Sequence, residues 1–221
     1  MGGLFGVLTV FKSNAFGANA NTGKFVLSNS KFSGKIYDAS STDVIAVGGL
    51  VGFDSTETNT SFQVVDGYAD IDLTDVLQVA GKYQYFAGGI VGYGASCTSG
   101  STADTDFLSI KNSRTEGAIS LSASAAAVDG LHSDAYLGGI VGSACLAQAK
   151  DMGLVNDTSS VKITSKVKTA VDGGKEVNGA PARDSVFVCG LIGFASVAVA
   201  NKPATFSSVY YDGSIVVEDS L

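Results

Sequence analysis

Five copies of a short glycine-rich apolar segment, here called the cassette, divide this 221-residue chain. They occupy residues 2–6, 48–52, 88–92, 138–142 and 189–193, so successive copies begin 46, 40, 50 and 51 residues apart. Self-similarity at such a period is typical of stacked repeat architectures, in which one unit cannot bury its apolar face alone. The cassettes therefore predict one continuous array over residues 1–221, and their structural glycines are Gly3, Gly6, Gly49, Gly52, Gly89, Gly92, Gly139, Gly142, Gly190 and Gly193.

A second pattern recurs between the cassettes. Each unit carries two apolar anchors nine residues apart: Leu27 and Ile36, Phe62 and Ile71, Ile110 and Ile119, Leu154 and Ile163, Phe206 and Ile215. Residues two positions apart share one face of a strand, so an odd separation places the two anchors on opposite faces of a straight strand. Both anchors can point inward only if the chain turns between them, which predicts a corner.

The predicted fold is all-β: a right-handed parallel β-helix, or β-solenoid, of about five coils with three strands per coil. The strands are the cassette and the two anchor segments, and the repeat units span about 2–47, 48–87, 88–137, 138–188 and 189–221. Equivalent strands would pair in parallel at about 4.8 Å, giving a rod roughly 24 Å long. The Ser-, Thr- and Asp-rich segments between them vary in length, as a solenoid tolerates.

Asparagine recurs two residues after the first anchor, at Asn29, Asn112 and Asn156, whereas units two and five carry Val64 and Ser208 there. Stacked amide side chains can bond along the axis of a pile of strands. We predict a partial asparagine ladder, interrupted by Val64. Binding of a ligand by exposed asparagines is the alternative.

The combination Gly-Gly-Ile-Val-Gly, Ile-x-Asn-Ser and Gly-x-Ile resembles the GLUG-motif repeats of bacterial surface and adhesin-like proteins. The match is clearest in unit three, at residues 88–92, 110–113 and 117–119. The resemblance covers essentially the whole chain and implies a β-helical, secreted or surface-exposed protein. It implies no catalytic residues, because the family motif is structural.

The net charge of −7 disfavours nucleic-acid partners, since no cluster of Lys and Arg is present to neutralise phosphates. The longest apolar stretch, 186–200, is too short to span a membrane and contains a cassette. We therefore expect neither nucleic-acid binding nor membrane insertion. No cofactor is expected either, because the cassettes lack the helix N-terminus and lysine of a phosphate-binding loop.

Three cysteines are too few for a disulfide framework or a zinc site. Cys97 and Cys145 follow their cassettes closely and could meet if the units stack, so we treat them as a candidate disulfide. Cys189 replaces a cassette glycine and is expected to be a small buried residue. Asn59 begins an Asn-Thr-Ser sequon and is a candidate glycosylation site.

The residues that flank the cassettes are apolar at adjacent positions, which face opposite sides of a strand, as in Phe86-Ala87 and Tyr136-Leu137. We expect the outer face of the cassette sheet to be covered by a loop, a further domain or a second molecule. No capping segment is recognisable at either end, which predicts a part of a larger protein or end-to-end stacking. The expected partners are therefore proteins, contacted through the cassette sheet or the open ends, in a homo-oligomer or filament.

Residues able to support catalysis do not form a recognisable motif. His132 lies in a predicted loop, and the candidate acids are scattered: Asp104, Asp106, Asp134, Asp151 and Asp157. We predict a non-enzyme, a stiff extracellular or cell-surface scaffold for attachment or filament assembly. The alternatives are a carbohydrate-active β-helix enzyme and a glycan-binding module that uses exposed tyrosines, for which the candidates are Tyr83, Tyr85, Tyr210 and Tyr211.

Overall fold

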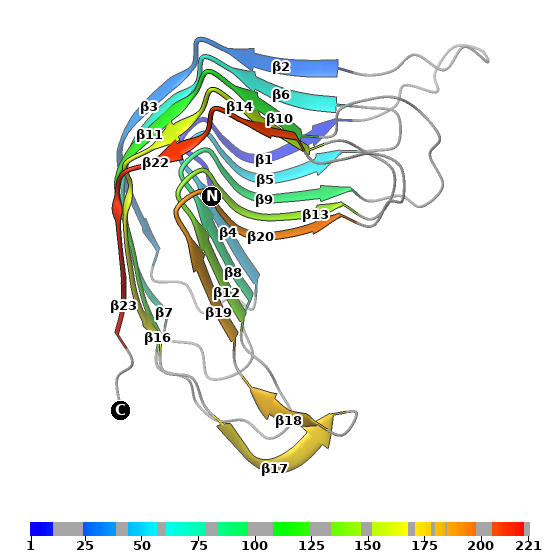
Figure 1. Cartoon of the computed structure of the whole chain (residues 1–221), viewed down its shortest axis with the longest axis vertical. Coiled ribbons are helices and arrows are strands. Elements are labelled where there is room, and N and C mark those ends of the chain that lie inside the picture. The colour runs from blue at the N-terminus through cyan, green and yellow to red at the C-terminus, as the bar shows by residue number, and fades with distance from the viewer. Residues whose placement is uncertain are drawn as a thin grey trace, which may run out of the picture.

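The computed structural model describes residues 1–10, 24–38, 44–56, 61–77, 84–96, 108–123, 134–146, 152–167, 171–177, 180–183, 185–197 and 205–218. Within these ranges the chain forms strands and turns, and no helix. Four parallel sheets make up the body, and a separate antiparallel hairpin joins β17 (Val171–Val177) to β18 (Ala180–Arg183) (Figure 1). No described segment is a helix long and apolar enough to cross a membrane.

The four parallel sheets are lettered A to D. Within one repeat the chain passes through them in that order, beginning with the strand that precedes the cassette. Sheet A contains β4 (Val44–Gly48), β8 (Gln84–Gly88), β12 (Asp134–Gly138) and β19 (Ser185–Cys189). Sheet B contains β1 (Phe5–Val10), β5 (Val51–Thr56), β9 (Val91–Ser96), β13 (Val141–Leu146) and β20 (Ile192–Val197).

Sheets C and D follow in each repeat. Sheet C contains β2 (Lys24–Ser28), β6 (Ser61–Val65), β10 (Leu108–Lys111), β14 (Met152–Val155) and β21 (Thr205–Ser207). Sheet D contains β3 (Lys31–Asp38), β7 (Tyr68–Leu77), β11 (Arg114–Ala123), β15 (Thr158–Ser159) with β16 (Lys162–Val167), and β22 (Tyr210–Tyr211) with β23 (Ser214–Val217).

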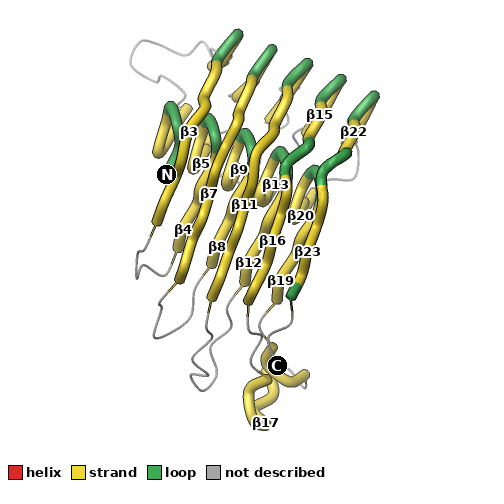
Figure 2. Tube along the Cα trace, turned by 90° about the vertical axis from the view of Figure 1, so that its left-hand side faces the viewer, coloured by secondary structure: helices red, strands yellow, loops and turns green. Residues whose placement is uncertain are grey.

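Equivalent strands of successive repeats lie side by side along one axis (Figure 2). All pairings within sheets A to D are parallel, from β1 with β5 to β16 with β23. The prediction of an all-β protein with parallel sheets is confirmed, and this arrangement is compatible with a β-solenoid. Figure 1 shows sheet B beneath sheet C and sheet A beside sheet D, so the core lies between these two pairs of sheets.

The cassette is a bend between two strands, so the prediction that it forms one strand, with three strands per coil, is wrong. In the second repeat β4 ends at Gly48 and β5 begins at Val51, so this repeat contains four strands, β4 to β7. The bend needs glycine because backbones meet there: a Cβ on Gly89 would lie 2.2 Å from the carbonyl oxygen of Gly139. Cassettes are nevertheless stacked in register, Gly48 with Gly88, Gly88 with Gly138 and Gly138 with Cys189.

The second repeat is shifted by two residues from the predicted alignment. Val64, not Phe62, pairs with Leu27 and Ile110, and Leu73, not Ile71, pairs with Ile36 and Ile119. The other predicted anchors are in register, since Ile119 pairs with Ile163 and Ile163 with Ile215. The shifted residues still face inward because a two-residue shift keeps the same face of a strand.

Ile71 instead occupies the column of small residues, beside Gly34 and Gly117. Its side chain is buried, and its Cγ2 atom lies 2.8 Å from the Cβ position of Gly49. Gly117 has φ +99°, and a Cβ there would lie 2.0 Å from the carbonyl oxygen of Ile71. In this column, the large side chain of Ile71 therefore stands between two residues that have no side chain. Such alternation is compatible with a densely packed core.

Candidate interaction surfaces

The turn between sheets C and D is made by one left-handed residue per repeat. Asn29, Asp66, Asn112, Asn156 and Ser208 have φ between 49° and 56°. Asn and Asp tolerate this region better than other residues with a side chain, which explains the recurring asparagines. We call these five residues the corner column. Its member in the second repeat is Asp66, so the expectation that Val64 interrupts the column is wrong.

Amide stacking occurs in part of the corner column. The Asn156 side-chain amide donates to Oδ1 of Asn112 over 3.2 Å, and both side chains are exposed. The backbone continues the column, because the N–H of each corner residue in the first four repeats donates to a carbonyl in the next repeat, as Asn29 does to Val65 and Asn112 to Val155. The asparagines therefore shape and link the corner.

The position after the corner residue forms a second, buried line of hydrogen bonds that the sequence patterns did not reveal. Ser113 Oγ accepts from the Gly67 N–H at 3.1 Å and donates to the Lys111 carbonyl. The Asp157 carboxylate accepts from the Ser113 N–H at 2.7 Å and the Val155 N–H at 2.8 Å. The only available signal was a short polar residue after the corner asparagine, and this common type carries little information.

Asp157 is the one predicted candidate acid whose surroundings strongly perturb its titration among the described residues. Burial raises the pKa of its carboxyl from 3.8 to about 7, and the two backbone N–H donors oppose that shift. The side chain is fully buried in the wall between sheets C and D. Its hydrogen bonds link the backbones of two successive corners.

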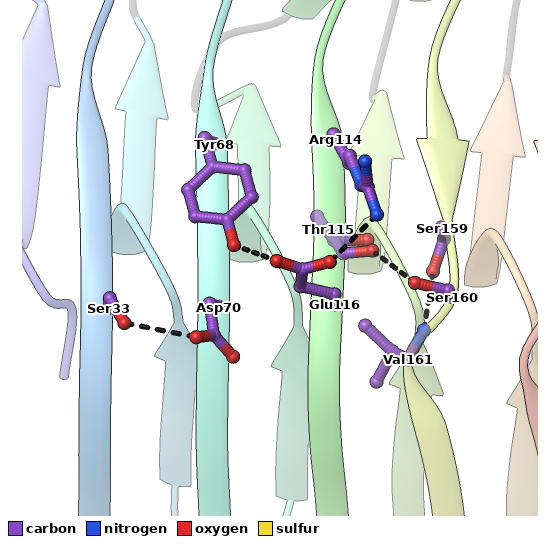
Figure 3. Close-up of polar contacts among 9 residues, drawn as sticks. All are labelled: Ser33, Tyr68, Asp70, Arg114, Thr115, Glu116, Ser159, Ser160 and Val161. Atoms are coloured by element: carbon purple, nitrogen blue, oxygen red, sulfur yellow. Dashed lines mark hydrogen bonds and ion pairs between the residues drawn. The ribbon is translucent and has the colours of Figure 1, made fainter.

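Charged and hydroxyl side chains on the outer face of sheet D bond to one another along the axis (Figure 3). Glu116 accepts from the Tyr68 hydroxyl of the preceding strand and forms an ion pair with Arg114 at 2.9 Å. Ser33 Oγ donates to Asp70 at 3.0 Å. The strands of neighbouring repeats are thus tied together by their exposed side chains as well as by their backbones.

Lysines of β3 make two further contacts with β7. Lys31 lies over the Tyr68 ring, 4.7 Å from its centre, and Lys35 pairs with Asp72 at 2.8 Å. The hydrogen bond from Lys35 holds the pKa of the Asp72 carboxyl below its ordinary value. These pairs are exposed and screened by solvent, so they contribute little to stability. Their value lies in fixing which residue faces which.

Six aromatic rings, here called the aromatic column, line the angle between the outer faces of sheets A and B: Phe53, Phe86, Tyr93, Tyr136, Phe187 and Phe194. Phe86, Tyr136 and Phe187 stack in turn, with ring centres 5.2 and 5.1 Å apart and nearly parallel planes. Tyr93 of sheet B stacks on Phe86 at 4.4 Å. Phe86 is only 6% exposed, whereas Phe187 and Phe194 of the last repeat are 39% and 37% exposed, so the open aromatic surface of this column lies at the last repeat.

The four tyrosines predicted to be exposed for glycan binding do not form a common platform. Tyr85 is fully buried between sheets A and D, where its hydroxyl donates to the Asp75 carboxylate, so its predicted exposure is wrong. Tyr211 is half-buried and donates to the Val161 carbonyl at 3.0 Å. Tyr210 is exposed, and Tyr83 lies outside the described residues.

Several other candidates fall outside the described ranges, namely Cys97, Asn59, His132, Asp104, Asp106 and Asp151. The disulfide, the glycosylation site and the loop position of His132 therefore stay predictions. Cys189 is an exposed free cysteine, contrary to the expectation that it is buried, because its strand β19 is the outermost strand of sheet A among the described residues. Asp134 lies at the start of β12, and the described part of the chain holds no group of three His, Cys, Asp or Glu placed to bind a metal.

Apolar core positions are open at both ends of the stack. Phe206 and Ile215 of the last repeat are 51% and 42% exposed, whereas their equivalents Leu154 and Ile163 are buried. At the first repeat a groove of about 440 Å³ exposes Phe32 and Ile36. The backbone edges of the terminal strands are unpaired among the described residues. Exposed edges of this kind are templates for pairing with another strand.

Comparison of the chain with protein-family models, with curated proteins and with solved structures found no match.

Proposed function

We propose that this chain is a right-handed β-solenoid of five repeats that acts as a non-catalytic extracellular or cell-surface scaffold. One observation carries the proposal: the residues that recur in each repeat contact their equivalents in the next repeat. Asn156 bonds to Asn112 and Phe86 stacks on Tyr136, and Tyr68 adds a bond to Glu116 of the neighbouring strand. Contacts directed along the axis resist bending and separation of the repeats, which is what a scaffold requires.

Support for a surface location comes from the resemblance of the cassettes to GLUG repeats, which occur in surface and adhesin-like proteins. The segments between the described strands differ in length from one repeat to the next, whereas the strands keep their register. Binding residues are commonly found on such connecting segments. Attachment to a surface is thus the role that this construction suits.

The location can be tested by labelling intact and permeabilised source cells with an antibody against the purified chain. Equal labelling is expected for a surface protein. Labelling only after permeabilisation would contradict the proposal. For the scaffold role, cells lacking the protein should attach less well to a surface, and attachment should return with the wild-type chain. Unchanged attachment in the deletion strain would remove the adhesive role.

A further inference from the structure

We propose that the partner of the open ends is a second copy of this chain, which stacks head to tail so that β21, β22 and β23 of one copy pair with β2 and β3 of the next. This inference rests on the proposed solenoid architecture and is tested in purified protein. Its failure would therefore leave the surface location untouched.

The register of such a junction follows from the register inside the chain. Sheets C and D keep one common offset between each pair of neighbouring repeats, since Leu27 pairs with Val64 just as Lys31 pairs with Tyr68. Continuing these columns places Phe206 beside Leu27 and Ile215 beside Ile36 of the second copy. Apolar positions exposed at each end would then be buried against one another.

Polar contacts already present inside the chain would be repeated at the junction. Tyr210 falls in the column of Lys31 and Tyr68, so its exposed ring would lie beside Lys31 of the second copy, which already covers Tyr68. Asp212 falls in the column of Ser33 and Asp70, so it would face the Ser33 hydroxyl that donates to Asp70. Two polar contacts found inside the chain would thus have counterparts at the junction.

The charges at the two ends of the stack favour head-to-tail contact over contact between two identical ends. The first repeat carries exposed lysines at its edge, Lys24, Lys31 and Lys35. The last repeat carries exposed Asp212 and Glu218, and Glu218 already pairs with Lys166 at 3.0 Å. Lysine on an edge strand opposes pairing with an identical edge, which disfavours contact between two first repeats. The same lysines attract the acidic edge of the last repeat. Head-to-tail contact also keeps the strands parallel, as they are throughout sheets A to D.

The close backbone approach at the cassettes supplies a specific probe. A Cβ on Gly92 would lie 2.6 Å from the carbonyl oxygens of Gly52 and Val47 in the preceding repeat. The equivalent Gly6 of the first repeat has no atom within 4 Å of its Cβ position. In the stacked arrangement Gly193 and Val188 of another copy would take the places of Gly52 and Val47. Gly6→Ala should thus obstruct the junction without disturbing the single chain.

Sedimentation velocity over a range of concentrations, with electron microscopy of the largest species, tests the proposal. The wild-type chain should form linear particles whose length grows with concentration. Gly6→Ala should weaken association at least about tenfold, given the usual effect of overpacking. The control Gly153→Ala adds the same methyl in a central repeat, where its nearest neighbour would be 3.8 Å away, and should leave association unchanged.

A charge exchange tests the register independently. Tyr210→Lys places two lysines together at the junction, and Lys31→Glu removes the cation from the ring, so each variant alone should associate about tenfold more weakly. A mixture of the two should recover association, because Lys at 210 then meets Glu at 31. Recovery cannot come from a misfolded variant. A monomeric wild-type chain, or association insensitive to all three substitutions, would overturn the proposal.

Discussion

Replacing Gly92 with alanine should destabilise the folded chain, whereas the same replacement at Gly6 should not. Both residues are the fifth in their cassette, and neither has a left-handed φ, so alanine is compatible with the backbone at both positions. They differ in what surrounds them. The Gly92 Cβ position lies 2.6 Å from the Val47 N, the Val47 carbonyl oxygen and the Gly52 carbonyl oxygen, and that of Gly6 is open.

The expected size of the effect follows from these contacts. All three neighbours of Gly92 are backbone atoms of strands held in parallel sheets, so relief requires that sheets A and B move apart at the bend. Overpacking of this kind costs about 1–3 kcal/mol, and the rigid neighbours place Gly92→Ala near the upper limit. Gly6→Ala should instead stabilise by about 0.5 kcal/mol, because alanine restricts the unfolded chain.

Urea unfolding followed by far-UV circular dichroism measures the difference, at a protein concentration where the chain is monomeric. With an m-value of about 2–3 kcal/mol per M, Gly92→Ala should lower the unfolding midpoint by about 1 M, and Gly6→Ala should leave it equal or slightly higher. Hydrogen exchange should locate the loss in β8 and β9. Equal midpoints for the two variants would refute the close approach of sheets A and B.

Three further predictions concern the corner and the buried hydroxyl. Because the pKa of Asp157 is about 7 in the folded chain and 3.8 ordinarily, the folded state binds the proton more tightly, so stability should be greatest below pH 4 and fall as pH rises towards 7. Asp157→Ser should flatten that slope in thermal melts at a series of pH values, and parallel slopes would contradict the assignment. Tyr85→Phe removes the hydroxyl that donates to buried Asp75 and should cost about 1–3 kcal/mol in urea unfolding, whereas Tyr37→Phe, on an exposed ring, should change little; equal effects would refute the buried bond. Asn112→Ala should cost about 1–2 kcal/mol more than Asn112→Gly, because only glycine accepts φ 52° without strain, and equal stabilities would argue against the left-handed corner.

The parallel all-β class could be predicted because the cassettes recur at a fixed place in each repeat, and Gly48, Gly88 and Gly138 do stack in register. Their local role could not. Gly-Gly followed by two apolar residues is compatible with a buried strand and with a bend. The bend is distinguished from a strand by its contacts with other repeats, such as that of Gly89 with Gly139. The residues of a single cassette do not show these contacts.

The shift in the second repeat has a different cause. Aligning the repeats by their isoleucines predicts Ile71 in the second anchor position, but Leu73 pairs with Ile36 there. The residue that sets the register is the left-handed one at the corner, and aspartate serves there as well as asparagine. Asp66-Gly67 is a turn dipeptide, and aligning Asp66 with the corner asparagines gives the observed register of this repeat.

The aromatic residues beside the cassettes show how one local misassignment changes a functional conclusion. If the cassette were a strand, Phe86 and Tyr93 would lie on an outer face that needs a partner to cover it. Because it is a bend, the outer faces of sheets A and B turn towards each other, and Phe86 stacks on Tyr93 within the same chain. Phe86 is only 6% exposed as a result. The cover expected from a second molecule is thus largely supplied by the chain itself, whereas Phe206 and Ile215 at the last repeat have no such neighbour among the described residues. Apolar surface that calls for a partner therefore lies at the ends of the stack and not along its sides.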